Sequence, residues 1–71
     1  MPRGGGVAIK SVSVKLKRLR ANQRLTQEAL ARKANVSLGY LARLETGQHD
    51  PKLSTLHKIA KALGVRVADL L

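Results

Sequence analysis

The sequence predicts a single all-α domain, a compact five-helix bundle. Apolar residues recur at helical spacing along most of the chain, Thr26 and Ser37 each suit the cap that precedes a helix, and Gly47 suits the residue that follows one. The 71 residues allow one hydrophobic core, because a chain of this size buries about 60% of the surface that it exposes when unfolded. We expect a flexible basic leader over residues 1–12 and the folded domain over residues 13–71.

The N-terminal stretch is compatible with two alternatives. Three consecutive glycines in "MPRGGG" are typical of a flexible segment, either an appended one or a basic arm that reaches DNA. The β-branched run "VAIKSVSV" suits an extended edge strand or the entry to a first helix capped by Ser11 or Ser13. That helix is expected over about residues 14–23, with Leu16 and Leu19 facing inward and basic side chains around them.

Two short helices with a tight connection are predicted next. One spans residues 27–34 after the cap Thr26, and the other spans residues 38–46 after the cap Ser37. Asn35 suits the left-handed conformation in which a helix ends. The inward-facing residues share helical spacing and are Leu30, Ala31, Ala34, Leu41 and Leu44. A connection of about three to four residues sets two helices at a steep angle, so the pattern predicts a helix-turn-helix, whose second helix enters the DNA major groove.

The last third of the chain predicts one longer helix and a final turn. Asp50 is the candidate cap, with Pro51 at the first helical position. An amphipathic pattern then runs to a stop at Gly64, and its inward-facing residues are Leu53, Leu56, Ile59, Ala60 and Leu63. The ending "VADLL" predicts a last, short helical turn.

The charge of the chain is strongly positive. Fourteen Lys and Arg against four Asp and Glu give a net charge of +10 and an isoelectric point near 11.4. Such a field attracts polyanions such as DNA, RNA or an acidic membrane surface. No apolar run approaches the roughly 18 residues of a membrane span, no secretory signal is present, and the absence of cysteine fits a reducing compartment. We therefore expect a cytoplasmic protein that does not enter the membrane.

Residues that perform catalysis or bind metals are few and scattered. His49 and His57 are not at a common metal-ligand spacing, and no cysteine accompanies them. No glycine-rich phosphate loop follows a strand, and a core of this size leaves no room for a dry cleft lined by Ser, His and Asp. We expect neither an enzyme nor a cofactor or metal site.

The outward face of the predicted third helix suits a nucleic acid. Gly39 and Ala42 are small and admit a close approach, and Arg43 offers a guanidinium fork. Glu45 is expected to turn back toward the domain, which leaves no carboxylate on this face to repel phosphate. Tyr40, the single aromatic residue, is expected either to pad the core edge and offer its hydroxyl to a phosphate or to touch a base.

Five segments together resemble the Cro/C1-type helix-turn-helix regulators, also called XRE-like. The segments are "LKRLR", "LTQEALARKANVS", "LARLETG", "DPKLSTLHKIAKALGV" and "VADLL", and the resemblance covers residues 16–71. It implies a lambda-repressor-like fold. It also implies a sequence-specific transcriptional regulator that binds double-stranded DNA through its third helix.

The resemblance assigns roles residue by residue. The implied DNA-contacting positions are Gln27, Ser37, Leu38, Gly39, Arg43, Thr46 and Gln48, to which we add Lys17 and Tyr40 as candidate phosphate contacts. Gln27 is implied to meet the DNA backbone and to brace the recognition helix. Arg20 and Glu45 match a family ion pair that ties the first helix to the end of the third.

Some positions depart from the family pattern. Leu38 and Gly39 stand where phage-type proteins often carry Gln, so direct readout would rest mostly on Arg43, a natural partner of guanine, with DNA shape and backbone contacts contributing the rest. Asn35 stands where Gly is frequent, and Arg66 stands where Ser or Thr usually caps the final helix.

One such domain covers few base pairs, so we expect a homodimer on two half-sites about one helical turn apart. Val67 and Leu71 in the ending "VRVADLL" are candidates for the dimer surface, or else they cover the domain's own core. Two other functions fit the sequence. One is a protein-interaction module of antitoxin type, and the other is a non-specific nucleic-acid binder that uses charge alone.

Overall fold

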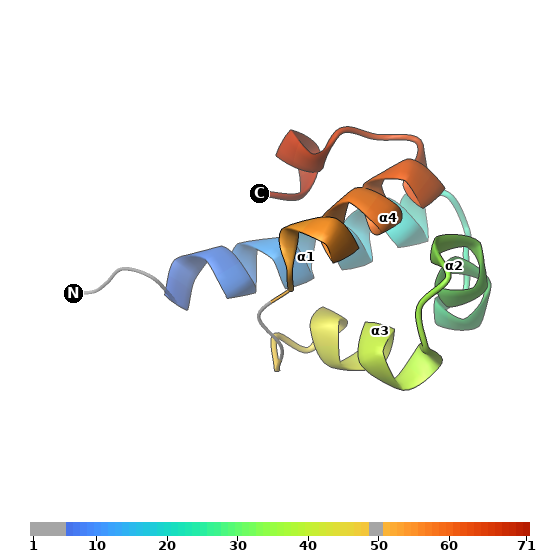
Figure 1. Ribbon diagram of the computed structural model, residues 1–71, viewed down its shortest axis with the longest axis horizontal. Helices are drawn as coiled ribbons and strands as arrows, with labels where there is room; N and C mark the ends of the chain where they lie inside the picture. Colours follow the sequence, from blue (N-terminus) through green and yellow to red (C-terminus); the bar gives the residue numbers. More distant parts are fainter. Residues whose placement is uncertain (1–5, 49–50) are drawn as a thin grey trace.

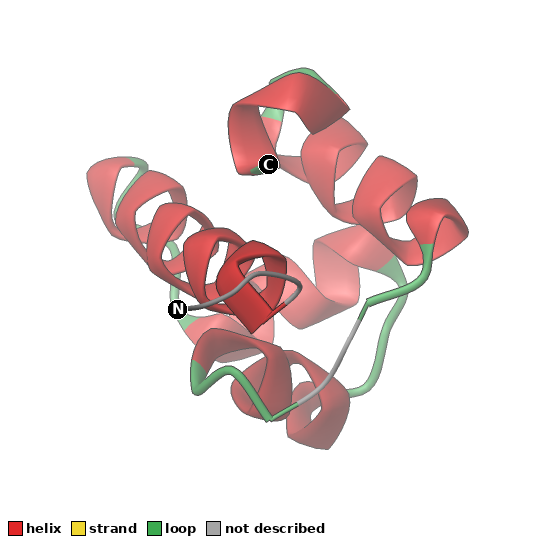
Figure 2. Cartoon of the chain, turned by 90° about the vertical axis from the view of Figure 1, so that its left-hand side faces the viewer, coloured by secondary structure: helices red, strands yellow, loops and turns green. Residues whose placement is uncertain are grey.

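Helices and short connections account for the residues that the computed structural model describes, 6–48 and 51–71, with side chains from residue 12 onward. The elements, shown in Figure 1, are α1 (Gly6–Asn22), α2 (Gln27–Ala34), α3 (Leu38–Glu45), α4 (Leu53–Leu63) and the 3-10 turn η1 (Val67–Leu70). Figure 2 shows helices joined by loops, with no strand in the described ranges. The all-α prediction is confirmed, although the predicted fifth helix is a 3-10 turn of four residues rather than an α-helix.

The first helix begins well before the predicted residue 14. Because α1 spans Gly6–Asn22, the edge-strand alternative is wrong, and Ser11 and Ser13 lie inside the helix rather than at its cap. The physical reason is burial: Val12 is 3% exposed, and burying a valine stabilises by about 1.5–3 kcal/mol, more than the few tenths by which β-branching disfavours a helix. The predicted leader falls partly on residues 1–5, which lie outside the described residues.

The helix-turn-helix segment has the predicted caps. The Ala29 N–H donates to the Thr26 hydroxyl at 3.0 Å, and the Tyr40 N–H donates to the Ser37 hydroxyl at 3.1 Å. Asn35 has a φ of 58°, the left-handed conformation that ends α2. The chain therefore leaves α2 and enters α3 within three residues.

The start of α4 differs from the prediction. The helix begins at Leu53 with Lys52 as its N-cap, no side chain hydrogen-bonds that end, and Pro51 precedes the cap rather than opening the helix. Lys52 itself is extended, with φ −73° and ψ 154°, and this conformation prevents the helix from including Pro51. Leu53 is 63% exposed, so its predicted core position is wrong, whereas the other inward-facing residues of this helix are buried. The candidate cap Asp50 lies outside the described residues.

One core joins every helix. Its six largest fully buried side chains are Leu16, Leu30, Leu41, Leu44, Ile59 and Leu70. The half-buried Val36, Tyr40 and Val67 pack against this core. The core therefore holds α3 against α1 and α2, and no helix in the described ranges is both long and apolar enough to cross a bilayer.

The final turn is capped from an unpredicted direction. Arg66 cannot accept a hydrogen bond with its side chain, but its backbone N–H donates to the Asp69 carboxylate at 3.0 Å, and its guanidinium lies 3.6 Å from the same group. The backbone hydrogen bond, together with the charges of Arg66 and Lys15, holds the pKa of Asp69 below its ordinary 3.8. An acidic residue in the first turn thus replaces the Ser or Thr cap of the family pattern.

We expect the Asp69 contribution to stability to depend on pH in one direction. Because the folded pKa is lowered, the carboxylate stabilises the fold above about pH 3.8, and this contribution is lost as the pH falls through the folded pKa. Titration of the Asp69 carboxyl by NMR should give a pKa below 3.8. In the Asp69→Asn protein the corresponding slope of stability against pH should disappear. A measured pKa at or above the ordinary value would contradict the cap.

Candidate nucleic-acid interface

Helix α3 lies at the edge of the domain. In Figure 1 it lies along the lower side, with α2 beside it and α4 on the far side of the core. Leu41 and Leu44 are buried, whereas Leu38 is 45% exposed and Gly39 and Arg43 face solvent. The helix therefore separates a leucine face that anchors it from an outer face with one guanidinium.

The turn after α3 continues this outer face. Thr46 and Gln48 are exposed, and the Thr46 hydroxyl donates to the Arg43 carbonyl at 3.0 Å, which caps the end of the helix. Gly47 has a φ of 77°, a left-handed conformation that suits glycine. Tyr40 is half-buried and packs against the core, so it lies at the margin of the outer face.

The carboxylate of Glu45 does not lie on the outer face. Its side chain is 1% exposed and forms a bidentate ion pair with Arg20, with Nε to Oε2 at 2.5 Å and Nη2 to Oε1 at 3.0 Å. Arg20 also donates from Nη1 to the carbonyl of Leu25 at 2.6 Å. The hydrogen bond to Glu45 raises the pKa of Arg20 above its ordinary value, so this guanidinium stays charged. The pair joins α1 to the end of α3, the two elements that the family resemblance links.

Gln27 completes this junction. Its amide Nε2 donates to Oε1 of Glu45 at 3.0 Å, so the first residue of α2 also holds the last residue of α3. Sequence reasoning assigned a bracing role to Gln27 without identifying Glu45 as its partner, because residues this far apart in sequence meet only in the fold. Glu45 thus accepts hydrogen bonds from both α1 and α2.

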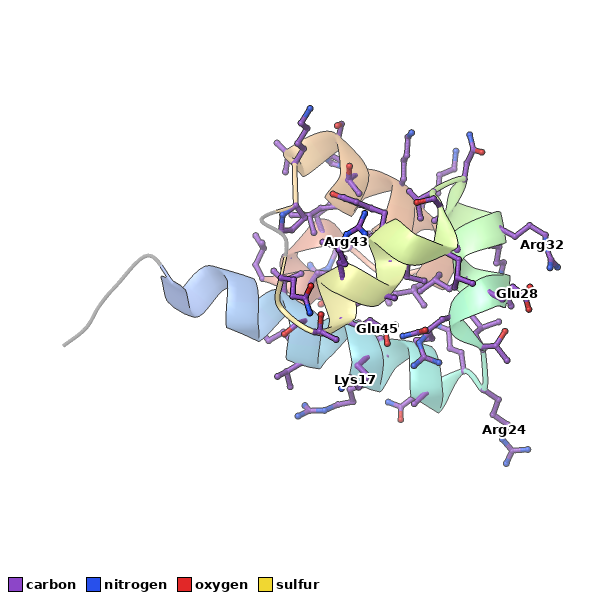
Figure 3. The ribbon with its side chains drawn as sticks, turned by 90° about the horizontal axis from the view of Figure 1, so that it is seen from below. Lys17, Arg24, Glu28, Arg32, Arg43 and Glu45 are labelled. Atoms are coloured by element: carbon purple, nitrogen blue, oxygen red, sulfur yellow. The ribbon has the colours of Figure 1, made fainter. Side chains whose placement is uncertain are left out.

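Cations of α1 lie beside the end of α3. A groove of about 490 Å³ between the two helices is lined by Ser13, Val14, Lys17, Arg18, Ala21, Glu45 and Thr46. Figure 3, seen from below Figure 1, shows Arg43 and Glu45 on α3 and Lys17 on the neighbouring α1. Arg24, Glu28 and Arg32 lie toward the edge of this view. The fold therefore brings Lys17, Arg18 and Thr46 to one groove.

A second basic groove lies between α2 and α4. It measures about 360 Å³ and is lined by Lys33, Ala34, Lys58, Lys61 and Ala62. In α2, Gln27 contacts α3, whereas Lys33 lies in the groove with α4, so this basic surface is separate from the outer face of α3. Sequence reasoning did not predict it.

Residues 16–70 match a protein family described as helix-turn-helix. The chain belongs to this helix-turn-helix family, in its Cro/C1 type. The match covers most of the chain and includes both helices of the motif, the groove residues of α1 from Leu16 onward and the final turn.

Relatives in this helix-turn-helix family are named for gene regulation. The chain is 45% identical over 58 residues to an immunity repressor protein of Bacillus phage phi105. The aligned residues are 40% of that protein and 82% of this chain. It is 46% identical over 56 residues to an HTH-type transcriptional regulator of Methanocaldococcus jannaschii, which covers 79% of this chain and 85% of that protein. The chain thus spans less than half of the phage repressor.

Two solved structures superpose closely on this chain. The restriction-modification controller protein of Aeromonas hydrophila superposes with a TM-score of 0.86 at 28% identity, over 89% of this chain and 96% of that one. The clp gene regulator of Corynebacterium glutamicum also gives a TM-score of 0.86, at 32% identity, over 97% of this chain and 71% of that one. The predicted family and fold are confirmed.

The names of the relatives that share this fold describe regulators and a repressor, and none of the names given above describes an enzyme. His57 is exposed, His49 lies outside the described residues, and no group of three or more potential metal ligands occurs among the residues described.

Proposed function

We propose that this protein is a sequence-specific, DNA-binding transcriptional regulator that inserts α3 into the major groove. The observation that supports this proposal is the outer face of α3. Small and cationic residues, Gly39 and Arg43, are exposed on it. It presents no carboxylate, because Glu45 is buried in its pair with Arg20. A braced helix that projects toward solvent with Gly39 and Arg43 exposed fits between the strands of a duplex. Arg43 and Leu38 face the bases in this arrangement.

Contacts to phosphate hold the domain in register. Gln27 at the start of α2, Thr46 and Gln48 after α3, and Lys17 in the α1–α3 groove surround the recognition helix. The capped N-terminus of α3 at Ser37 adds backbone N–H groups, which favour an anion. These contacts position the protein without specifying sequence, so base preference is left to the outer face of α3.

We further propose that the regulator binds as a homodimer. Helix α3 has 8 residues and is about 12 Å long, which spans about three to four base pairs. Much of the predicted dimer surface is occupied internally, because Leu70 is buried and Val67 packs against the core. Leu71 is 55% exposed and remains the candidate contact in that segment.

Because the compared relatives come from a bacteriophage and an archaeon, whose genes are in cytoplasm, we place this regulator there.

One observation favours a second candidate function, a non-specific nucleic-acid binder. Lys33, Lys58 and Lys61 form a basic groove that the proposed DNA complex does not use. The antitoxin-type alternative has less support. A protein-interaction module would tolerate a large apolar patch on the outer face of α3, where Leu38 is the one large apolar side chain.

Selection of binding sites from random duplex DNA tests the proposal. A regulator should enrich one sequence and bind it at least about 10³-fold more tightly than random DNA at equal salt. Both DNA-binding functions should lose affinity with salt, at a slope of about −0.9 per phosphate contact. Steep salt dependence with no enriched sequence would support the non-specific binder and reject the regulator.

Arg43→Ala should weaken binding to the selected site by about 1–3 kcal/mol and relax preference at one base pair. Lys17→Ala should weaken all sequences alike and reduce the salt slope by about 1. Lys58→Ala is the matched control, since it also removes one positive charge, but from the α2–α4 groove. It should leave the affinity for the selected site and the salt slope nearly unchanged. Titrations of labelled duplex at several salt concentrations measure all three. Equal losses in the three variants would mean that α3 does not face the bases.

A further inference from the structure

Gly39 lies in the first turn of α3, in the base-facing part of the outer face, and is exposed. A Cβ placed on it would have one neighbour within 4 Å, Nη1 of Arg43 at 4.0 Å. The guanidinium of Arg43 therefore lies over the position where a side chain of residue 39 would begin.

This arrangement follows from helix geometry. Side chains of a helix point back toward its N-terminus, and residues i and i+4 are neighbours on its surface. Arg43 has its Cα in the second turn of α3, but its guanidinium returns to the first turn. The N-terminal residues of a recognition helix are those that meet base edges, so the return brings the guanidinium to that zone.

Neither backbone conformation nor packing requires glycine at this position. Among the glycines that the structure describes, those with positive φ are Gly47 and Gly64. Gly39 is helical, and in a helix glycine is less stable than alanine. No core atom lies near its absent side chain. The group that a long side chain at position 39 would displace is the guanidinium of Arg43.

We propose that Gly39 and Arg43 form a single recognition unit, in which Gly39 leaves its base-facing position vacant and the Arg43 guanidinium occupies it to bind a guanine. Leu38, exposed beside this unit, faces the neighbouring base pair, where a thymine methyl suits it. The preferred half-site thus contains a guanine next to a thymine. This assignment rests on the proposed DNA-binding function and adds the base class and the role of Gly39.

The test compares base preference at the guanine position in the natural protein and in Gly39→Ala, Gly39→Leu and Arg43→Ala. Alanine adds a carbon at an ordinary contact distance, so Gly39→Ala should keep the preference. Leucine occupies the space of the guanidinium, so Gly39→Leu should reduce the preference for guanine about 5- to 150-fold, as should Arg43→Ala. Thermal unfolding should show Gly39→Leu to be at least as stable as the natural protein, since leucine is the better helix former.

The double variant Gly39→Leu with Arg43→Ala separates an effect through Arg43 from an independent one. If Gly39 acts through Arg43, adding Gly39→Leu to Arg43→Ala should cause no further loss of guanine preference. A further loss of the same size as in the single variant would overturn the unit, and so would a Gly39→Leu protein that prefers guanine as the natural protein does. If either of these results is found but the natural protein still prefers one DNA sequence, only the Gly39–Arg43 unit is rejected and the regulator function is retained. If the natural protein shows no sequence preference, both proposals are rejected.

Discussion

Arg20→Ala is expected to destabilise the domain by about 3–5 kcal/mol, because it breaks a largely buried ion pair. The substitution leaves the Glu45 carboxylate, 1% exposed, without its cation and with the Gln27 amide as its remaining side-chain partner. It also removes the hydrogen bond to the Leu25 carbonyl. Urea unfolding followed by circular dichroism measures the change, with the denaturant slope checked for two-state behaviour.

Two matched variants make this prediction specific. Glu45→Ala should cost less than Arg20→Ala, because the Arg20 side chain is 17% exposed and its charge can reach water. Arg20→Lys should be intermediate, since lysine keeps the charge but cannot form the bidentate fork. A loss below about 1 kcal/mol for Arg20→Ala would show that the pair behaves as an exposed one. Equal losses for Arg20→Ala and Glu45→Ala would contradict the expected difference between the two partners.

Leu41→Ala is expected to destabilise the domain by about 2–5 kcal/mol. Leu41 is 0% exposed and is one of the two leucines by which α3 is packed into the core, so the truncation leaves a cavity beneath the recognition helix. A domain of this length has a total stability of about 4–11 kcal/mol, so this variant loses a large part of it. Thermal and urea unfolding measure the loss.

Leu53→Ala is the matched control for Leu41→Ala. It removes the same atoms from a leucine that is 63% exposed, and its effect should stay within about 0.5 kcal/mol. Similar losses in the two variants would contradict the burial on which the anchoring of α3 depends. If DNA is added to the folded fraction of Leu41→Ala, its base preference should be that of the natural protein, because Leu41 does not reach the outer face.

Local sequence signals predicted the helix-turn-helix well because they act within a few residues. Thr26 and Ser37 cap their own helices, and Asn35 provides the left-handed end between them. The same signals failed at the turn after α1, where Arg24 has a φ of 58° without being glycine or asparagine. No composition cue marks such a residue, and backbone hydrogen bonds close the turn, with the Leu25 N–H donating to the Arg20 carbonyl at 3.1 Å.

The starts of α1 and α4 both differ from what the local sequence signals predict. The β-branched run before residue 14 favours extended structure locally, yet Val12 and Ser13 are buried in a helix. Pro51 suits a first helical position, yet the helix begins at Leu53. In α1 burial outweighs the weak local preference, whereas in α4 the extended conformation of Lys52 places the start of the helix after Pro51.

The sequence by itself determined the helical class, the family, the motif and the identity of the cation on α3, since helical periodicity, caps and charge are written along the chain. The tertiary structure decided which of these groups meet. It placed Gln27 and Arg20 on one buried carboxylate, Lys17 beside the end of α3, and Arg43 over Gly39. Except for the Arg43–Gly39 contact within α3, these are contacts between different helices, and their geometry depends on how the common core sets the helices against one another.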